Sequence, residues 1–340
     1  MPKTIRNEFY KCLTYEKLME AHLNSRKGKG TRKEIILFNL KQEEYIKYLL
    51  EQLQTKQYKH GGYTTFYVTE PKIRKIEKSI YLDRIVHRWL VDNILSPAFT
   101  PMFINTSFAC IKNRGMHKAC LKVQQDMKHC RRIWNEYYIL KMDVAKYFDN
   151  INKEILFNII KRKIKDENVL WLIKSILYAQ ERDKKLEIGN YTSQMFANIY
   201  LNEVDQFVKH KLHIKYYYRY MDDALLLVKT KKEAKEALYA IRSFLKNNLE
   251  LELNAKTQIF KNKQGVNFCG YKINEYRLKI RDKGKRKLKK KIKSLKEKIK
   301  KGELSSKEAK RYIAGHLGYI KIANTNNLEE KLFYKYRLYF

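Results

Sequence analysis

The sequence predicts an α+β fold whose central part is a ferredoxin-like antiparallel sheet. Between residues 137 and 272, strand-like and helix-like segments follow the order strand, helix, insert, strand, strand, helix, strand. This order matches a split βαβ arrangement. The chain has 340 residues, which is enough for two or three sub-domains. The net charge is +37, from 73 basic and 36 acidic residues, and indicates a polyanionic partner, with nucleic acid ahead of an anionic membrane.

Composition excludes several other classes of protein. Hydrophobic residues make up 44% of the chain, so it is expected to fold and not to be a disordered basic tail. The five cysteines form no CxxC pair, which disfavours a zinc site or a disulfide framework and favours reduced thiols in a cytoplasmic protein. No apolar run approaches the roughly 18 residues that span a bilayer, and the N-terminus lacks a signal-peptide core. We therefore expect no membrane association.

Helices and one hairpin are predicted in the first part of the chain. Residues 39–54 and 81–97 carry apolar side chains at helical spacing. Between them, residues 59–76 begin with a Gly-Gly turn and continue in β-branched and aromatic alternation, which is typical of a hairpin. Residues 108–128 are interpreted as a basic loop around Gly115 that leads into a helix.

The central strands follow. Residues 137–148 alternate like a strand that reaches Asp143, and Asn152 is a good N-cap for the next helix. Residues 214–229 are interpreted as a pair of strands, after which Thr230 and Glu233 form a capping box. Two short strand-like pieces close this part, at residues 249–254 and 266–273.

A very basic helix is predicted near the C-terminus. Residues 281–301 contain 13 Lys or Arg against two acids. The apolar residues repeat at 4-3-4 spacing and form a narrow seam: Leu288, Ile292, Leu295 and Ile299. The helix could be only a solvated face, but the overall charge favours a nucleic-acid duplex as its partner.

Two adjacent carboxylates, Asp222 and Asp223, lie between two apolar strand-like runs in "YYRYMDDALLLVK". A turn between antiparallel strands would hold both at its tip, and Asp143 lies near the end of another strand. If those strands are neighbours, three carboxylates converge, which is costly unless divalent cations such as Mg²⁺ bind there. Two ions about 4 Å apart support phosphoryl transfer. An isolated Asp-Asp pair is more often a solvated turn, but the apolar flanks and the third Asp favour the metal site.

"YMDD" (220–223), together with "MDVAKYFDNI" upstream, resembles the catalytic motifs of reverse transcriptases. The blocks "PKIRKI", "DRIVHRWLVDNILSPAF", "IGNYTSQMFANIYLNEVDQF", "LNAKT" and "FCGYKI" follow in the family's order, and the resemblance covers roughly residues 10–325. It implies an RNA-directed DNA polymerase with the shape of a right hand. The expected parts are an N-terminal helical extension (1–60), fingers (61–136), a palm (137–272, with a fingers insert at about 151–213) and a helical thumb (273–340).

The resemblance also implies roles for individual residues. Asp143, Asp222 and Asp223, with Val144, would hold two Mg²⁺ ions, with Mn²⁺ as the alternative, and the substrates would be dNTPs. Phe148 would lie under the nucleotide sugar and exclude a 2′-OH, with a core aromatic, or a combination of both roles, as the alternative. Lys256 would protonate pyrophosphate, with an ordinary surface lysine as the open alternative. The other implied nucleotide contacts are Lys72, Arg74, Lys146, Tyr147, Ile188, Gly189 and Gln194. The implied contacts to RNA–DNA or DNA duplex are Lys285, Arg286, Lys289, Lys290 and Lys293.

The stretch "IGNYTSQ" (188–194) resembles the enzymes of diversity-generating retroelements. Many reverse transcriptases have Gln-Gly at its start and Ser-Pro at its end, whereas this chain has Ile188-Gly189 and Ser193-Gln194. The likeness implies error-prone copying of a template-repeat RNA into cDNA that replaces part of a target gene. It also implies a small, basic, oligomeric accessory protein. The C-terminal "GHLGYIKIANTNNL" resembles the thumb ending of the same group.

Other readings of the sequence stay open. Retron enzymes usually carry Ser-Pro in this block and a late Val-Thr-Gly signature, and group II intron proteins normally extend beyond the thumb. A phage-defence relative that polymerises without a template is a third possibility. The alternative outside enzymes is a basic RNA-binding scaffold that has lost catalysis, against which the three aspartates argue.

Overall fold

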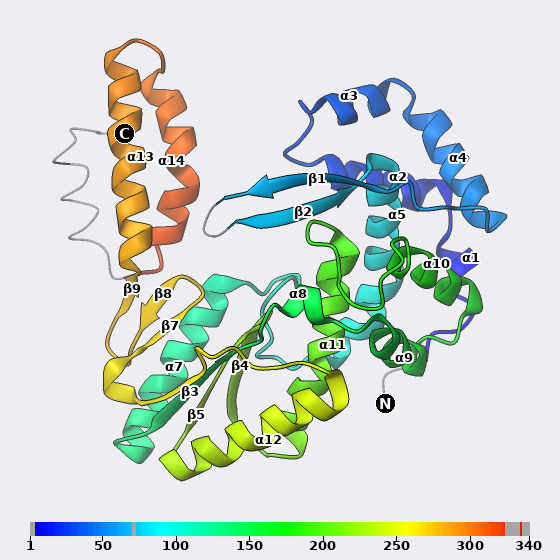
Figure 1. Cartoon of the computed structure of the whole chain (residues 1–340). Coiled ribbons are helices and arrows are strands. Elements are labelled where there is room, and N and C mark those ends of the chain that lie inside the picture. Colours follow the sequence, from blue (N-terminus) through cyan, green and yellow to red (C-terminus); the bar gives the residue numbers. More distant parts are fainter. Residues whose placement is uncertain (1–3, 70–72, 324–333, 335–340) are drawn as a thin grey trace. The chain divides into compact units, whose positions relative to one another are not determined.

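The computed structural model describes residues 4–69, 73–323 and 334 (Figure 1). The chain forms two compact units. The first unit comprises residues 1–111, 143–213 and 239–255, and the second comprises residues 112–142, 214–238 and 256–340. Among the residues so described, no helix is both long and apolar enough to cross a membrane.

The first unit begins with four helices and a hairpin. The helices are α1 (Phe9–Cys12), α2 (Tyr15–Arg26), α3 (Lys33–Leu40) and α4 (Gln42–Gln54). The predicted hairpin is confirmed as β1 (Tyr63–Val68) and β2 (Arg74–Ser79), which pair antiparallel from Tyr63 opposite Ser79 to Val68 opposite Arg74 (Figure 1). The exposed residues of β1 include Phe66, whose side chain is 43% exposed.

A continuous helical run follows the hairpin and confirms the helix predicted at 81–97. It consists of α5 (Tyr81–Leu90), the π-turn η1 (Val91–Leu95), α6 (Ser96–Phe99) and the 3₁₀ turn η2 (Thr100–Met102). Its buried face includes Ile85, Trp89 and Leu90, which are fully inaccessible to solvent. The core of this unit therefore lies along α5, on which α2 packs.

The rest of the first unit is helical. Its elements are α8 (Tyr147–Asn150), α9 (Lys153–Lys163), α10 (Glu167–Leu177) and α11 (Tyr191–His210). The predicted N-cap of α9 is confirmed, because the Asn152 side chain accepts hydrogen bonds from the backbone N–H groups of Glu154 and Ile155. Asn198 of α11 donates to the carbonyl of Ala109 at 2.8 Å, which ties this helix to the loop after η2.

The second unit contains the predicted ferredoxin-like sheet. Its strands are β3 (Tyr138–Asp143), β4 (Tyr216–Tyr220), β5 (Asp223–Val228) and β6 (Gln258–Lys261). They lie in the order β4-β5-β3-β6, in which β4 pairs antiparallel with β5, and β3 with β6. This order is that of a split βαβ sheet and confirms the predicted α+β class. Helix α7 (Met116–Trp134) begins after Gly115, as expected.

The predicted strand at 249–254 is wrong, because its first residue ends α12 (Lys231–Leu249). Glu250 has a φ of 50°, a left-handed conformation that interrupts any extended run. Leu253 forms only an isolated bridge to Val144, and the strand that joins the sheet is β6. The predicted capping box of α12 is present, since Glu233 N–H donates to Thr230 Oγ1 at 3.1 Å.

A three-stranded sheet and two helices complete the second unit. The strands are β7 (Val266–Phe268), β8 (Tyr271–Ile273) and β9 (Leu278–Ile280). They come after the 3₁₀ turn η3 (Asn262–Gln264) in the chain. The helices are α13 (Asp282–Lys300) and α14 (Ser306–Ile320), which pack on each other (Figure 1). The predicted apolar seam of α13 is buried at Leu288, Ile292 and Leu295. The fingers, palm and thumb boundaries stay a prediction.

Asp166 stabilises two helix starts in the first unit, and its loss should weaken the fold. Its Oδ2 accepts from the N–H groups of Glu8 and Phe9 at 2.7 and 2.9 Å, and its Oδ1 accepts from those of Asn168 and Val169. We expect Asp166→Ala to lower the free energy of unfolding by about 2–4 kcal/mol, because buried N–H groups lose their acceptor. Urea unfolding would measure the change.

Glu51→Ala, which removes an exposed carboxylate from α4, is the matched control for this measurement. It should change the free energy of unfolding by less than about 0.5 kcal/mol. Equal stability of the two variants would show that the Asp166 hydrogen bonds contribute nothing.

Candidate functional site

The turn between β4 and β5 carries the adjacent aspartates. Tyr220 pairs with Asp223, so Met221 and Asp222 form a two-residue turn and Asp223 is the first residue of β5. Met221 has a φ of 57°, which costs about 1–2 kcal/mol for a residue with a side chain. Arg219, which is 1% exposed, donates from Nη1 to the Met221 carbonyl at 3.1 Å. A buried guanidinium therefore holds the strained turn.

The hairpin under the turn is rigid because both strands are buried. Tyr217 and Tyr218 are each 1% exposed, and Leu225 and Leu226 are fully buried. The Tyr218 hydroxyl donates to Asp126 of α7. Burial, with the nearby Asp126 charge, raises the pKa of Tyr218 far above its ordinary value, so the phenol stays protonated and keeps donating.

Lys141 of β3 neutralises Asp223. Its Nζ lies 2.9 and 3.0 Å from the two carboxylate oxygens of Asp223 and also donates to the carbonyl of Asn267. The ammonium lies 5.8 Å from the centre of the Phe268 ring, on its face. Because β3 and β5 are adjacent strands, this ion pair links two neighbouring strands of the sheet through their side chains.

Asp143 is the last residue of β3, and the segment around Leu253 holds it. Asn254 donates from its backbone N–H to the Asp143 carbonyl at 2.7 Å and from Nδ2 to Asp143 Oδ2 at 3.3 Å. Val144 is 6% exposed and bridges to Leu253. The carboxylate orientation is therefore set by an amide donor from a distant segment.

The carboxylate oxygens of these aspartates are the donors that Mg²⁺ and Mn²⁺ prefer. Within the described ranges, no group of three or more His, Cys, Asp or Glu side chains is placed to hold a metal ion. The Asp223 carboxylate already forms an ion pair with the Lys141 ammonium group at 2.9 Å. The donor chemistry thus fits a hard divalent ion, and its binding at these residues stays a prediction.

The segment after Asp143 positions three predicted nucleotide contacts. Lys146 is exposed and has a φ of 43°, and it precedes the short helix α8. Tyr147 is 2% exposed, and its hydroxyl donates to the Ala197 carbonyl of α11, so it anchors the segment in the core. Phe148 is half-buried, with its ring 5.6 Å from that of Tyr147 in an edge-on arrangement. Of the three, Lys146 and Phe148 have side chains that solvent reaches.

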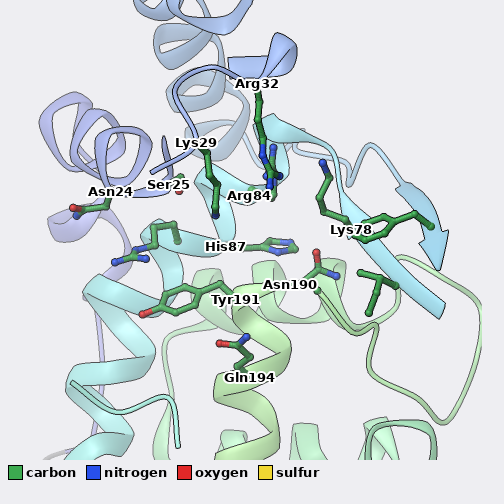
Figure 2. Close-up of a pocket in the computed structure, with 14 residues that line it drawn as sticks. Asn24, Ser25, Lys29, Arg32, Lys78, Arg84, His87, Asn190, Tyr191 and Gln194 are labelled. Carbon is green, nitrogen blue, oxygen red and sulfur yellow. The ribbon is translucent and has the colours of Figure 1, made fainter. Parts of the chain in front are cut away.

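The turn at 188–190 is locked to strand β2. Glu77 N–H donates to the Ile188 carbonyl at 3.0 Å, and Asn190 Oδ1 accepts from the N–H and the hydroxyl of Ser79. Gly189 has a φ of 123°, and a Cβ there would lie 2.8 Å from Ile76 Cγ2, so only glycine fits. Gly189 and Gln194 line one cavity of about 360 Å³ together (Figure 2).

The other predicted contacts to nucleotide and duplex lie on separate segments of the chain. Arg74 begins β2 and is exposed, whereas Lys72 lies outside the described residues. Lys256 is exposed in the turn before β6. Arg286, Lys289, Lys290 and Lys293 are exposed on α13, and Lys285 is half-buried near Asp282.

Sequence reasoning missed Lys141, although a signal for it exists. In a strand, residues two apart point to the same face, so Lys141 shares the face of Asp143. A lysine at that position in an otherwise apolar strand is a candidate counter-charge for acids at the same sheet edge. The basic residues of the cavity in Figure 2 were also missed, because they come from segments far apart in the chain.

Comparison with known proteins shows which family the chain is similar to. Residues 69–273 match the family described as "Reverse transcriptase (RNA-dependent DNA polymerase)". The Retron Ec73 reverse transcriptase of Escherichia coli is 28% identical over 55% of this chain and 56% of its own length. The group II intron-encoded protein LtrA of Lactococcus lactis subsp. cremoris is 24% identical over 68% of this chain and 50% of its own length. The chain therefore spans less than two thirds of the curated relatives it matches.

A solved structure shows the same fold at low sequence identity. Telomerase from Candida albicans, in complex with a fragment of telomeric RNA, superposes with a TM-score of 0.51 and 12% identity. The match covers 71% of this chain and 49% of that one. It supports a right-hand polymerase architecture of mixed helices and antiparallel sheets.

Replacing Lys141 should change how tightly a divalent cation binds at Asp223. We expect Lys141→Met to tighten Mn²⁺ binding about two- to fivefold, because the ammonium of a half-exposed pair no longer competes for the carboxylate oxygens. Isothermal titration calorimetry would measure the dissociation constant. Lys141→Arg, which keeps the charge, should bind as the unsubstituted chain does. Equal affinity of the Met and Arg variants would contradict competition between lysine and cation.

Proposed function

Because the chain belongs to the reverse transcriptase family, we propose that it is an RNA-directed DNA polymerase whose chemistry depends on Asp143, Asp222 and Asp223. One observation carries the proposal. The family match spans residues 69–273, and within it Asp143 ends β3 and Asp223 begins the adjacent strand β5, with Asp222 in the turn before it. The carboxylates supply hard oxygen donors at a sheet edge.

The reaction joins the 3′-oxygen of a primer to the α-phosphorus of a dNTP while the bond to the β-phosphate breaks and pyrophosphate leaves. When bound, two divalent ions would activate the attacking oxygen and stabilise the negative charge on the leaving oxygen. The chain's own residues bind and orient the reactants. Arg74 grips the triphosphate, Phe148 lies under the sugar, and Lys256 donates a proton to pyrophosphate. The basic face of α13 follows the backbone of the duplex product.

Lys141 has a positioning role in this proposal. Its ion pair with Asp223 fixes one carboxylate beside the Met221-Asp222 turn before any cation arrives. Arg219 and the buried tyrosines of β4 hold the conformation of the turn when a cation binds or dissociates. The aspartates are therefore pre-organised by neighbours that take no part in the chemistry.

Asp222→Asn tests catalysis directly. We expect primer extension on an RNA template with Mg²⁺ to fall at least about a thousandfold, since loss of a ligand carboxylate removes several kcal/mol of transition-state stabilisation. Product length on a sequencing gel measures it. Glu236→Gln, which neutralises an exposed carboxylate on α12, should extend as the unsubstituted chain does. No extension by the unsubstituted chain, with RNA binding intact, would support the RNA-binding scaffold instead.

The finer proposal is that the enzyme copies a template-repeat RNA with frequent errors in a diversity-generating retroelement. The residues Ile188, Ser193 and Gln194 support it, because they depart from the Gln-Gly and Ser-Pro pattern of many relatives. In this assignment the chain works with a small, basic, oligomeric accessory protein. The competing proposal is a retron-type or group II-like enzyme, which the similarity to Retron Ec73 reverse transcriptase and LtrA supports. A nearby imperfect repeat that differs mainly at adenines is expected only for the first.

Ile188→Gln should raise the fidelity of copying if Ile188 weakens discrimination between correct and incorrect nucleotides. The backbone around Ile188 is fixed by Glu77 and by the tight packing of Gly189 on Ile76. A glutamine there could hydrogen-bond the nascent base pair, and one such contact is worth about 1–3 kcal/mol, or roughly a ten- to hundredfold drop in misincorporation. Sequencing of cDNA made in vitro measures it, with Ile188→Leu as the apolar control. An error spectrum that is the same in all three enzymes would reject the hypothesis.

A further inference from the structure

The β7–β8 hairpin of the second unit ends in a tight turn. Phe268 pairs with Tyr271, so Cys269 and Gly270 form a two-residue turn. Their φ angles are 46° and 86°, and a type I′ hairpin turn needs two positive φ angles of this kind. Gly270 adopts its angle without strain, whereas a left-handed backbone is unfavourable for Cys269 because it has a side chain. The contacts around the turn must therefore hold it in this form.

Helix α14 is attached to the turn by a reciprocal pair of tyrosines. The Tyr271 hydroxyl donates to the Tyr319 carbonyl, and the Tyr319 hydroxyl donates to the Gly270 carbonyl at 2.6 Å. The centres of the two rings lie 4.6 Å apart, with their planes tilted by 31°. We term this arrangement the tyrosine clasp. It fixes the last turn of α14 to the hairpin at two points (Figure 1).

The tyrosine clasp is tightly packed and stays protonated. A Cβ at Gly270 would lie 2.5 Å from the Tyr319 hydroxyl oxygen, so a larger residue there would displace the tyrosine. Tyr271 is fully buried. Burial is the main cause that raises the pKa of both phenols above the ordinary value, so both keep their hydrogens near neutral pH and continue to donate.

The same hairpin contacts the lysine that supports the acidic turn. The Asn267 carbonyl of β7 accepts a hydrogen bond from the Lys141 ammonium, which also pairs with both carboxylate oxygens of Asp223. The ammonium lies 5.8 Å from the centre of the Phe268 ring, and the Cys120 thiol donates to the Phe268 carbonyl at 3.6 Å. A continuous series of contacts thus runs from α14, through the hairpin and Lys141, to Asp223.

Helices α13 and α14 do not need the tyrosine clasp to pack on each other. The seam of α13 is already buried at Leu288, Ile292 and Leu295. Tyr319 also lies close to the start of α13, where a Cβ at Gly284 would be 3.7 Å from its ring. The two hydrogen bonds of the clasp therefore determine where this helix pair sits on the hairpin.

We propose that Tyr319 is a positioning residue for the acidic turn, and that it acts through the β7–β8 hairpin and Lys141. The Asn267 carbonyl and Asp223 share one ammonium, so a shift of the hairpin changes the geometry of the ion pair. The inference rests on the proposed function, in which a duplex lies along α13. A duplex that holds α13 and α14 in place then also fixes Lys141, and through it the Asp223 carboxylate.

The first test measures single-turnover addition of one dNTP to a primer on an RNA template with Mg²⁺. We expect Tyr319→Phe to lower the maximal rate about three- to tenfold, the range for one lost hydrogen bond. The KM for the dNTP should not change, because the clasp includes none of the residues proposed to bind the triphosphate. Tyr312→Phe is the matched control, since Tyr312 is 59% exposed on the same helix. Equal rates for the two variants would overturn the proposal.

The second test asks whether the effect passes through Lys141. The same rates are measured in a Lys141→Met chain, in which the ammonium is absent. Tyr319→Phe should then lower the rate by less than about twofold, because residues that act through one another have non-additive effects. If the two substitutions instead multiply, Tyr319 acts by another route and the proposal is wrong. Loss of stability alone predicts such multiplication.

A third measurement needs no catalysis. In a Cys110→Ser chain, which lacks the exposed thiol, the rate of labelling by N-ethylmaleimide reports on the half-buried Cys269 in the turn. We expect Tyr319→Phe to speed labelling about three- to tenfold, because a loosened turn opens more often, and Tyr312→Phe to leave it unchanged. Unchanged labelling in Tyr319→Phe would overturn the clasp whether or not the chain polymerises. Faster labelling in a chain without polymerase activity would refute the proposed function and leave the clasp standing.

Discussion

The two-residue turn between β4 and β5 constrains the catalytic chemistry proposed for this chain. Asp222 and Asp223 are adjacent carboxylates that repel each other, and the residues of β4 and β5 on either side of the turn are buried, so the turn has little freedom to move them apart. Arg219 holds the turn from inside by its bond to the Met221 carbonyl, and Lys141 holds Asp223 from the adjacent strand. The Arg219 guanidinium and the Lys141 ammonium thus stabilise a strained, acidic turn.

The large positive charge of the chain is divided between two uses. Lys141 and Arg219 act on internal groups of the second unit, where they support the acidic turn. Lys29 and Arg32 in the first unit have no carboxylate partner among the described residues, and burial and then the neighbouring arginines lower the pKa of Lys29. Net charge alone cannot distinguish these uses, since it counts each lysine equally.

Several local features could be read directly from the residues. The Asn152 cap, the Thr230–Glu233 box and the hairpin before Tyr81 depend on side chains close in sequence, and the structure has all three. The strand expected at 249–254 failed because a left-handed Glu250 follows the end of α12, and alternating Leu and Glu cannot reveal a φ angle. The Lys141–Asp223 pair was missed because its partners are 82 residues apart.

The sequence by itself determined the α+β class, the strands around residues 138–143 and 216–228 and the three aspartates worth testing, because periodicity, caps and motif spacing are local properties. Tertiary structure decided which cation faces which acid, why Gly189 must be glycine beside Ile76, and that loops from the N-terminal extension and the hairpin enclose one basic cavity. Those features arise where segments distant in the chain pack together, and burial there sets the strength of each charge.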